Sequence, residues 1–262
     1  MKITSILIPL RNKTLALSAY DTVTELSRVL YHRRITVDRF GYLNQFSCYN
    51  LLGTESFPET APTSEYEYFS DICDDVATSL IEKSNLEDKL IYVLWSGGVD
   101  STCIISCLLR SGIPIYRLRV LYTDHSIIEN ERFFHFLHSK GITTIKLEDT
   151  SILLEAINNG YLVSGCCADS LFEEVTYYKL AHIYNNSYKE LLKNLDLYKE
   201  IPKIMSMSTH YDLNINTVSD FFYMMNFCCN WGVDSLVIPT LVKTDNNVIR
   251  FFTDIRFQRW SL

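Results

Sequence analysis

The hydrophobic positions between residues 66 and 185 follow two alternating patterns. The continuous apolar run at residues 90–95 is typical of a strand buried on both faces, and further strands are predicted at residues 115–122, 143–147 and 161–164. Apolar residues that recur every three or four positions predict helices at about 66–83, 102–110, 129–139, 152–157 and 170–183. Strands that alternate with helices indicate right-handed β-α-β units, so we expect an α/β fold with a parallel sheet.

The two ends of the chain differ from this middle part. Residues 1–60 combine short apolar pieces with a basic cluster between Arg28 and Arg39, and they are predicted to form a small N-terminal region. Residues 56–65 contain Pro58 and Pro62 among Ser, Thr and Glu, which is typical of a linker. We therefore expect a larger domain over residues 66–262, with a helical C-terminal part.

Composition narrows the functional classes. The 262 residues carry a net charge of −7, which argues against a general nucleic-acid coat, because such proteins neutralise phosphates with Lys and Arg. No apolar stretch approaches the roughly 20 residues that cross a bilayer, so we expect no membrane association and a cytoplasmic location. The eight cysteines include no CxxC pair, which favours reduced thiols over a disulfide framework or a zinc knuckle.

The clearest chemical signal is the run from Ser96 to Ser101, SGGVDS, between a predicted buried strand and a predicted helix. A helix that begins there would direct several backbone N–H groups at one point and so form an anion site. Gly97 and Gly98 would let a phosphate approach the backbone, and the two serines would add hydroxyl donors. Asp100 is predicted either to cap the helix or to lie near a Mg²⁺ ion.

This run resembles the SGGxDS signature of the PP-loop ATP pyrophosphatases, a family that includes asparagine synthetases and tRNA-thiolating enzymes. The resemblance implies a PP-loop fold in which ATP is cleaved to AMP and pyrophosphate, with ATP and Mg²⁺ as cofactors. It implies that Ser96, Gly97, Gly98, Val99, Asp100 and Ser101 bind the phosphates. It also implies that Leu121 and Tyr122, at the end of the second strand, hold the adenine mainly through backbone groups.

A second run, residues 163–172, resembles the SGEGADELFGG run of the asparagine synthetase synthase domain. The two agree at Ser164, Gly165, Ala168, Asp169, Leu171 and Phe172. The resemblance implies that Gly165 lies beside the phosphate loop and that Asp100 and Asp169 are catalytic residues that share a metal ion. A weaker echo of the family's PFLD run occurs at residues 251–254. Among the cations near it, we expect Lys243 to stabilise charge on the reacting phosphates, as could Arg250, Arg256 and Arg259.

Departures from that pattern leave the reaction open. Cys166, Cys167 and Ser170 replace the family's Glu, Gly and Glu, and Lys2 stands where a glutaminase half would begin with cysteine. We expect an AMP-forming ligase that adenylates a carboxylate or carbonyl oxygen of a small acid or amide, with ammonia from a separate source. One alternative is a sulfurtransferase or nucleobase-modifying enzyme acting on nucleic acid, in which cysteines carry sulfur. Another is a nucleotide-binding module without catalysis.

Three further side chains near the second strand invite an interpretation. His125 is either a general base or a solvated loop residue. Ser126 is predicted to cap the helix that follows, and Glu129 is predicted to support the same cap.

Overall fold

The computed structural model describes residues 6–10, 13–17, 68–166, 168, 185–194, 215–218, 220–221, 247–254 and 256–257. The chain forms two compact units, residues 1–57 with 172–233 and residues 58–171 with 234–262. Residues 172–233 thus belong with the N-terminal region, a grouping that the sequence does not reveal. In this unit, β1 (Ile6–Leu10) pairs with β2 (Lys13–Leu17) in antiparallel fashion, and the described helix is α7 (Tyr188–Asn194).

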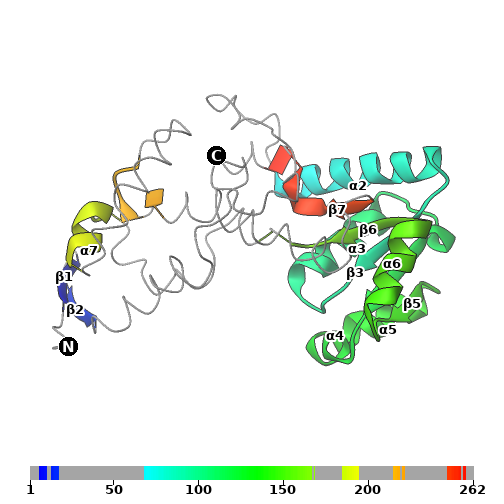
Figure 1. The fold of residues 1–262 in the computed structure, drawn as a ribbon, viewed down its shortest axis with the longest axis horizontal. Coiled ribbons are helices and arrows are strands. Elements are labelled where there is room, and N and C mark those ends of the chain that lie inside the picture. The colour runs from blue at the N-terminus through cyan, green and yellow to red at the C-terminus, as the bar shows by residue number, and fades with distance from the viewer. Residues whose placement is uncertain are drawn as a thin grey trace. The chain divides into compact units, whose positions relative to one another are not determined.

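The second unit is built on a five-stranded sheet in which all strands run parallel. Across the sheet, the order is β5 (Thr143–Lys146), β4 (Leu118–Tyr122), β3 (Leu90–Leu94), β6 (Gly160–Ser164) and β7 (Val248–Arg250). The predicted α/β class with a parallel sheet is therefore confirmed (Figure 1). Strand β7 was not predicted, because three residues are too short a run to stand out from the sequence.

The helices of this unit lie close to their predicted positions. They are α2 (Phe69–Leu86), α3 (Val99–Arg110), α4 (Asp124–Glu129), α5 (Glu131–Ser139) and α6 (Thr150–Asn159). Among them we find none with the length and apolar character that a membrane span requires, a finding that covers the described residues alone. The helix predicted at 170–183 and most of the predicted helical C-terminal part lie outside the described residues.

Two predictions about these elements were wrong in part. Residues 129–139 do not form one helix: α4 ends at Glu129, and Asn130 starts α5 by accepting a hydrogen bond from the Phe133 N–H at 3.1 Å. The predicted strand 115–122 begins only at Leu118. Its first three residues form the 3₁₀ turn η2 (Ile115–Arg117), because the chain turns at Pro114, whose carbonyl accepts the Arg117 N–H at 2.8 Å.

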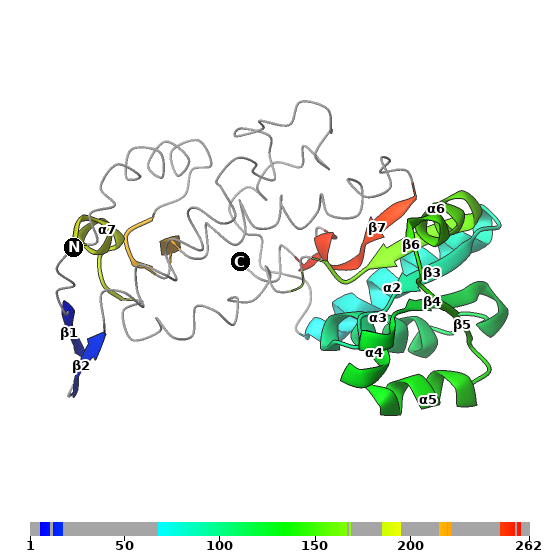
Figure 2. The same cartoon turned by 60° about the horizontal axis from the view of Figure 1, so that its bottom comes forward.

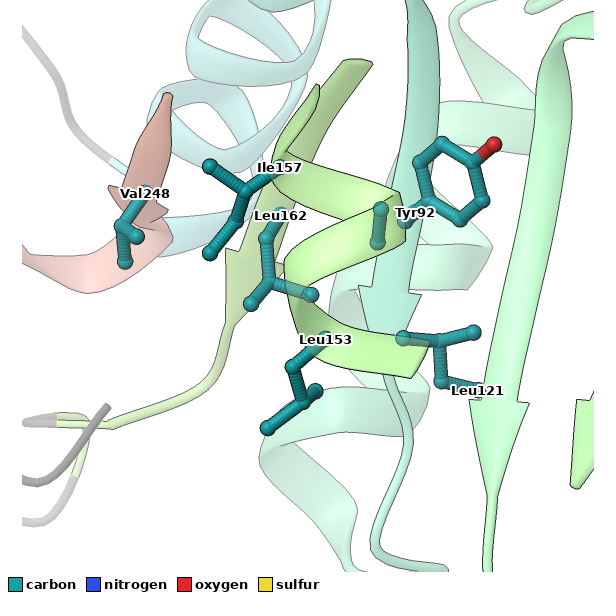
Figure 3. Close-up of a cluster of buried hydrophobic side chains, with 7 residues drawn as sticks. Tyr92, Leu121, Leu153, Ile157, Leu162 and Val248 are labelled. Atoms are coloured by element: carbon teal, nitrogen blue, oxygen red, sulfur yellow. The ribbon is translucent and has the colours of Figure 1, made fainter. Parts of the chain in front are cut away.

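The central strands of the sheet are buried on both faces because helices cover both. On one face, Tyr92, Leu121, Leu162 and Val248 pack against α6, which contributes Leu153, Ala156 and Ile157 (Figure 3). Alternation along the strands places Val93, Val120 and Val163, all fully buried, on the opposite face. Such two-sided burial explains why β3 appears in the sequence as a continuous apolar run.

Glycine is required where β6 enters the sheet. A Cβ atom on Gly160 would lie 2.2 Å from the carbonyl oxygen of Leu90, the first residue of β3. No side chain fits in that space. The close approach of β6 to β3 therefore depends on this glycine.

The topology marks one place in the sheet for a ligand. From β3 the chain moves outward through α3 to β4 and then to β5, and it returns through α6 to β6 on the other side of β3. Right-handed connections in opposite directions place α3 and α6 on opposite faces of the sheet (Figure 2). The order of strands thus reverses between β3 and β6. In open α/β sheets, ligands bind outside the carboxyl ends of the strands at this kind of switch point.

Candidate functional site

The SGGVDS loop connects β3 to α3 at this switch point. The Ser96 N–H donates to the Ser101 hydroxyl at 3.1 Å, the two serine hydroxyls lie 3.2 Å apart, and the Gly98 N–H donates to the Ser96 hydroxyl at 3.2 Å. Helix α3 begins directly after Gly98, which offers no side-chain cap. The N-cap residue therefore supplies no side-chain acceptor for the first amides of α3, an arrangement typical of an N-terminal anion site.

Asp100 lies in the first turn of α3, half-buried, and is not the N-cap residue. The capping role considered from the sequence is therefore wrong, because Gly98 holds that position. A carboxylate in the first turn interacts favourably with the helix dipole. Its other predicted role, near a Mg²⁺ ion, stays a prediction.

The two loop glycines are needed for different reasons. Gly97 has φ of +93°, and a Cβ atom there would lie 2.5 Å from the Ser126 carbonyl oxygen, so the fold itself requires glycine. Gly98 has an ordinary φ of −69°. A Cβ atom on it would meet only the ends of flexible side chains, the Ser96 hydroxyl at 3.2 Å and the Glu129 carboxylate at 3.4 Å. The backbone conformation at residue 98 therefore does not require glycine.

The turn after β6 packs directly on the start of α3. A Cβ atom on Gly165 would lie 3.1 Å from the Asp100 Cβ atom and 3.2 Å from the Ser101 backbone nitrogen. The structure thus brings together the two motifs that the resemblance pairs. Asp169, Cys167 and Ser170 lie outside the described residues, so a metal shared by Asp100 and Asp169 stays a prediction.

Glu129 is a candidate site residue that sequence reasoning missed. It ends α4, and its carboxylate faces Gly98 of the SGGVDS loop, while one of its oxygens lies 3.9 Å from the His125 imidazole. Both side chains are largely solvent-accessible, at 84% for His125 and 45% for Glu129. Nothing in the sequence places residue 129 beside residue 98, because that contact depends on the direction in which α4 leaves β4.

Helix α4 has its own cap, and it is Thr123 rather than Ser126. The Thr123 hydroxyl accepts the Ser126 N–H at 3.3 Å, and the Ser126 hydroxyl accepts the Thr123 N–H at 3.1 Å, which completes a capping box. The buried Ser126 hydroxyl also donates to the Trp95 carbonyl at 2.8 Å. Since Trp95 directly precedes the phosphate loop, this bond fixes α4, and with it Glu129, against the loop.

The residues assigned to adenine lie next to the loop but are already engaged. The Leu121 carbonyl accepts the Trp95 N–H at 2.8 Å, and the Tyr122 carbonyl accepts the Leu147 N–H at 2.7 Å. The Tyr122 ring packs on Phe134 with ring centres 4.8 Å apart. An adenine held by either carbonyl would use the second lone pair of that oxygen. The adenine assignment stays a prediction.

The two described cationic residues near the end of the chain have different surroundings. Arg256 pairs with Asp254 through two nitrogens, at 2.8 and 2.9 Å. Burial raises the pKa of Asp254, but the hydrogen bonds from Arg256 outweigh it and lower that pKa overall. Arg250 is buried at the carboxyl end of β7, in register with Ser164. Lys243 and Arg259 lie outside the described residues, so the role of Lys243 stays a prediction.

No protein-family model matches the chain, and no curated protein matches it significantly. The chemistry of this site must therefore be argued from its own residues.

The residues present fit a phosphate group that carries a metal ion. The α3 amides and the Ser96 and Ser101 hydroxyls offer hydrogen-bond donors, while Asp100 and Glu129 border the same loop with carboxylates. Carboxylates and a bare phosphate would repel one another, but a divalent cation between them removes the conflict. Oxygen ligands of this kind are those that Mg²⁺ uses together with nucleotide phosphates. The donor set therefore suits a magnesium nucleotide better than a free anion.

Proposed function

We propose that this chain is an ATP-dependent, AMP- and pyrophosphate-forming ligase of the PP-loop type, similar to the asparagine synthase domain. One observation carries the proposal. The start of α3, which lacks a side-chain cap, meets the Gly165 turn at the switch point between β3 and β6. The two motifs that the resemblance pairs lie about 65 residues apart in the sequence, and they form one surface at the edge of the sheet where nucleotides bind in such folds.

In this proposal each residue near the loop has a distinct task. The first amides of α3 and the Ser96 and Ser101 hydroxyls hold the phosphates, and Asp100 and Glu129 orient the Mg²⁺ ion that neutralises them. An oxygen of the acceptor attacks the α phosphorus, and the bond to the β phosphate breaks with its electron pair leaving on pyrophosphate. An amine or ammonia then attacks the adenylated carbon, and AMP leaves.

The position of Cys166 bears on the alternative in which a cysteine carries sulfur. Its side chain packs against the apolar cluster under α6, and its N–H donates to the Ser164 hydroxyl at 3.3 Å. This packing favours a space-filling role for Cys166. We therefore retain the ligase as the proposed function.

The products of ATP turnover test the proposal. The purified chain is incubated with MgATP, ammonia and a panel of small carboxylic acids, and the nucleotides are separated. AMP and pyrophosphate formed only with an acid would support the ligase. Release that needs a nucleic acid or a base would support the modifying enzyme, and ATP binding without cleavage would support a binding module. Accumulation of ADP and phosphate would rule out the proposed chemistry.

A matched pair of variants links such turnover to the loop. Asp100 and Asp71 both lie in the first turn of a helix whose N-cap residue makes no side-chain bond, but only Asp100 borders the phosphate loop. Asp100→Asn should raise the Mg²⁺ concentration needed for half-maximal turnover by about tenfold or more, as the loss of a metal contact does. Asp71→Asn should leave it unchanged. Equal effects of the two variants would remove Asp100 from the metal site.

A further inference from the structure

Three cysteines meet where α2 packs against α3. Cys73 comes from α2, and Cys103 and Cys107 come from α3, one helical turn apart on the same face. The three sulfur atoms all lie within 4.8 Å of one another, and those of Cys103 and Cys107 are 3.8 Å apart. Within the described part of the chain, this is the one cluster of three or more His, Cys, Asp or Glu side chains with ligand atoms this close.

The spacing of these sulfur atoms suits a single metal ion. A Zn–S bond is about 2.3 Å long, so two sulfurs bound to one tetrahedral ion lie about 3.8 Å apart. Cys103 and Cys107 already have this separation. The limit of 4.8 Å on the other pairs means that Cys73 would have to move by about 1 Å at most, which a change in a side-chain torsion supplies.

The surroundings favour negative charge on the cluster. An Arg110 nitrogen lies 3.9 Å from the Cys107 sulfur, and Asp74 holds the guanidinium in place at 2.6 Å. Hydrogen bonds with the Cys107 and Cys73 thiols, together with the charge of Arg110, lower the pKa of Cys103. Hydrogen bonding with Cys103 raises the pKa values of Cys73 and Cys107. The guanidinium beside the sulfur atoms is the geometric feature that favours negative charge here.

Access to the cluster is one-sided. Cys73 and Cys107 are buried, with 1% and 3% of their surface exposed, whereas Cys103 is only half-buried. An ion would reach the sulfurs past Cys103 and would then be enclosed by the two helices. Soft thiolate ligands in this arrangement select thiophilic ions, of which Zn²⁺ and Cu⁺ are the common closed-shell examples.

We propose that Cys73, Cys103 and Cys107 form a three-thiolate site for a thiophilic closed-shell cation, Zn²⁺ or Cu⁺, that links α2 to α3. Binding releases the protons that the thiols carry, and the lone pairs of the three sulfurs form the bonds to the ion; no electron is transferred. This metal site does not depend on whether the chain is a ligase. An ion bound there would fix α3, the helix that begins at the SGGVDS loop, against α2.

Metal titrations of the whole chain test this site. Chelator-treated, reduced protein is titrated with Zn²⁺ and, in a separate anaerobic experiment, with Cu⁺ against a chromophoric competitor. We expect one tightly bound ion per chain for at least one of the two metals and a higher melting temperature in its presence. X-ray absorption of the zinc form should show three sulfur neighbours at about 2.3 Å.

Single substitutions locate the ion. Cys73→Ser and Cys107→Ser should weaken binding by more than about 100-fold, because even changes next to a ligand cost 10–100-fold. Cys166→Ser, which removes a half-buried thiol elsewhere, is the matched control and should bind as the unaltered chain does. Since the two buried serines could disturb folding, the half-exposed Cys103→Ser provides the same test, with circular dichroism to confirm the fold.

Three results would overturn the proposal. One is binding that is equally tight in Cys103→Ser and in Cys166→Ser. Another is fewer than three sulfur neighbours around the bound ion. The third is a failure of both metals to bind to the reduced chain. A supporting result is an affinity that rises with pH, because protons compete with the metal for the two thiols whose pKa values are raised.

Discussion

Two neighbouring turns at the edge of the sheet differ in how they cap the helix that follows. Both leave the carboxyl end of a central parallel strand and enter a helix, β3 into α3 and β4 into α4. At the start of α4, the Thr123 hydroxyl accepts an amide of the first turn, and the Ser126 hydroxyl completes the box. At the start of α3, Gly98 provides no such acceptor. One turn caps its helix with its own side chains, and the N-cap residue of the other does not.

Under the proposed function, this contrast separates a turn that stabilises its own helix from a turn that holds a phosphate. The next turn along the sheet, from β5 into α6, is capped as well, since the Asp149 carboxylate accepts the Ser151 N–H at 2.7 Å. A capping side chain is worth about 1 kcal/mol to a helix, so its omission at Gly98 gives up a readily available stabilisation. This omission occurs at the switch point of the sheet, where a phosphate could supply the missing acceptor.

The largest effect should come from giving α3 the cap that it lacks. In Gly98→Asp, the new carboxylate would accept the first amides of α3 and occupy the place of the phosphate with a negative charge. We expect ATP-dependent pyrophosphate release to fall by about 100-fold or more. The free energy of unfolding should rise by a few tenths of a kcal/mol, because aspartate caps a helix better than glycine. Turnover assays and denaturant unfolding on the same protein measure both.

Gly98→Ala is the control for this change. Its methyl group would touch only the flexible ends of Ser96 and Glu129, so the fold should tolerate it, while no new acceptor reaches the amides. Turnover in Gly98→Ala should therefore exceed that in Gly98→Asp. Turnover in Gly98→Asp equal to that of the unaltered chain would show that the start of α3 is not the phosphate site.

A smaller effect is expected from the carboxylate that α4 brings to the loop. Glu129→Gln should raise the Mg²⁺ concentration for half-maximal turnover by about tenfold, because a carboxylate near the metal is lost. Glu131→Gln is the matched control. Glu131 lies two residues after Glu129, and like Glu129 it lies near a histidine one helical turn away, His135, at 3.6 Å. If the two variants have the same magnesium dependence, Glu129 does not approach the metal.

Removing the cap of α4 should affect stability rather than activity. Thr123→Ala deletes the hydroxyl that accepts the Ser126 N–H, and it should lower the free energy of unfolding by about 1 kcal/mol. The Michaelis constant for ATP should stay within about twofold of the unaltered value, since this cap faces no ligand in the proposal. Thr123→Ser keeps the hydroxyl and should restore the stability. A large rise in the Michaelis constant in Thr123→Ala would contradict the division between the two turns.

The smallest effect concerns the acid sensitivity of the third turn. Hydrogen bonds from the Ser151 side chain and backbone lower the pKa of Asp149. A group whose pKa is lower in the folded state stabilises the protein above its unfolded pKa and loses that contribution as the pH falls. The unaltered chain should therefore melt slightly above Asp149→Asn at neutral pH, and the difference should shrink in acid. Thermal unfolding across this range measures it, and a difference that grows in acid would contradict the assignment.

Much of the fold around the site is visible in the sequence because burial leaves a local trace. Strand β3 is covered on both faces and appears as an unbroken apolar run, and the SGGVDS run is recognisable directly after it, before a helix. The boundary between α4 and α5 leaves no such trace, since Asn130 is a polar residue that could equally well lie within one helix. Its capping bond is seen only in the structure.

What the sequence hides are contacts between distant segments. Cys103 and Cys107 have the spacing of one helical turn, but Cys73 lies thirty residues earlier, and only the packing of α2 on α3 brings it to them. Strand β7 also joins the sheet from far away in the sequence. Asn247, just before it, accepts a hydrogen bond from the Lys89 ammonium at 3.0 Å and donates one to the Ile157 carbonyl at 2.9 Å. No periodicity reports such contacts.

Packing requires glycine at some positions of this chain and not at others. This difference predicts which glycines would be kept in descendants that lost the proposed activity. Gly160 and Gly97 are held by backbone atoms 2.2 and 2.5 Å from the place of a side chain, so packing alone would preserve them in an inactive lineage. Gly98 is under no such pressure. Substitution of residue 98, with glycine kept at 97 and 160, would therefore identify a descendant that kept the fold but lost the proposed phosphate binding.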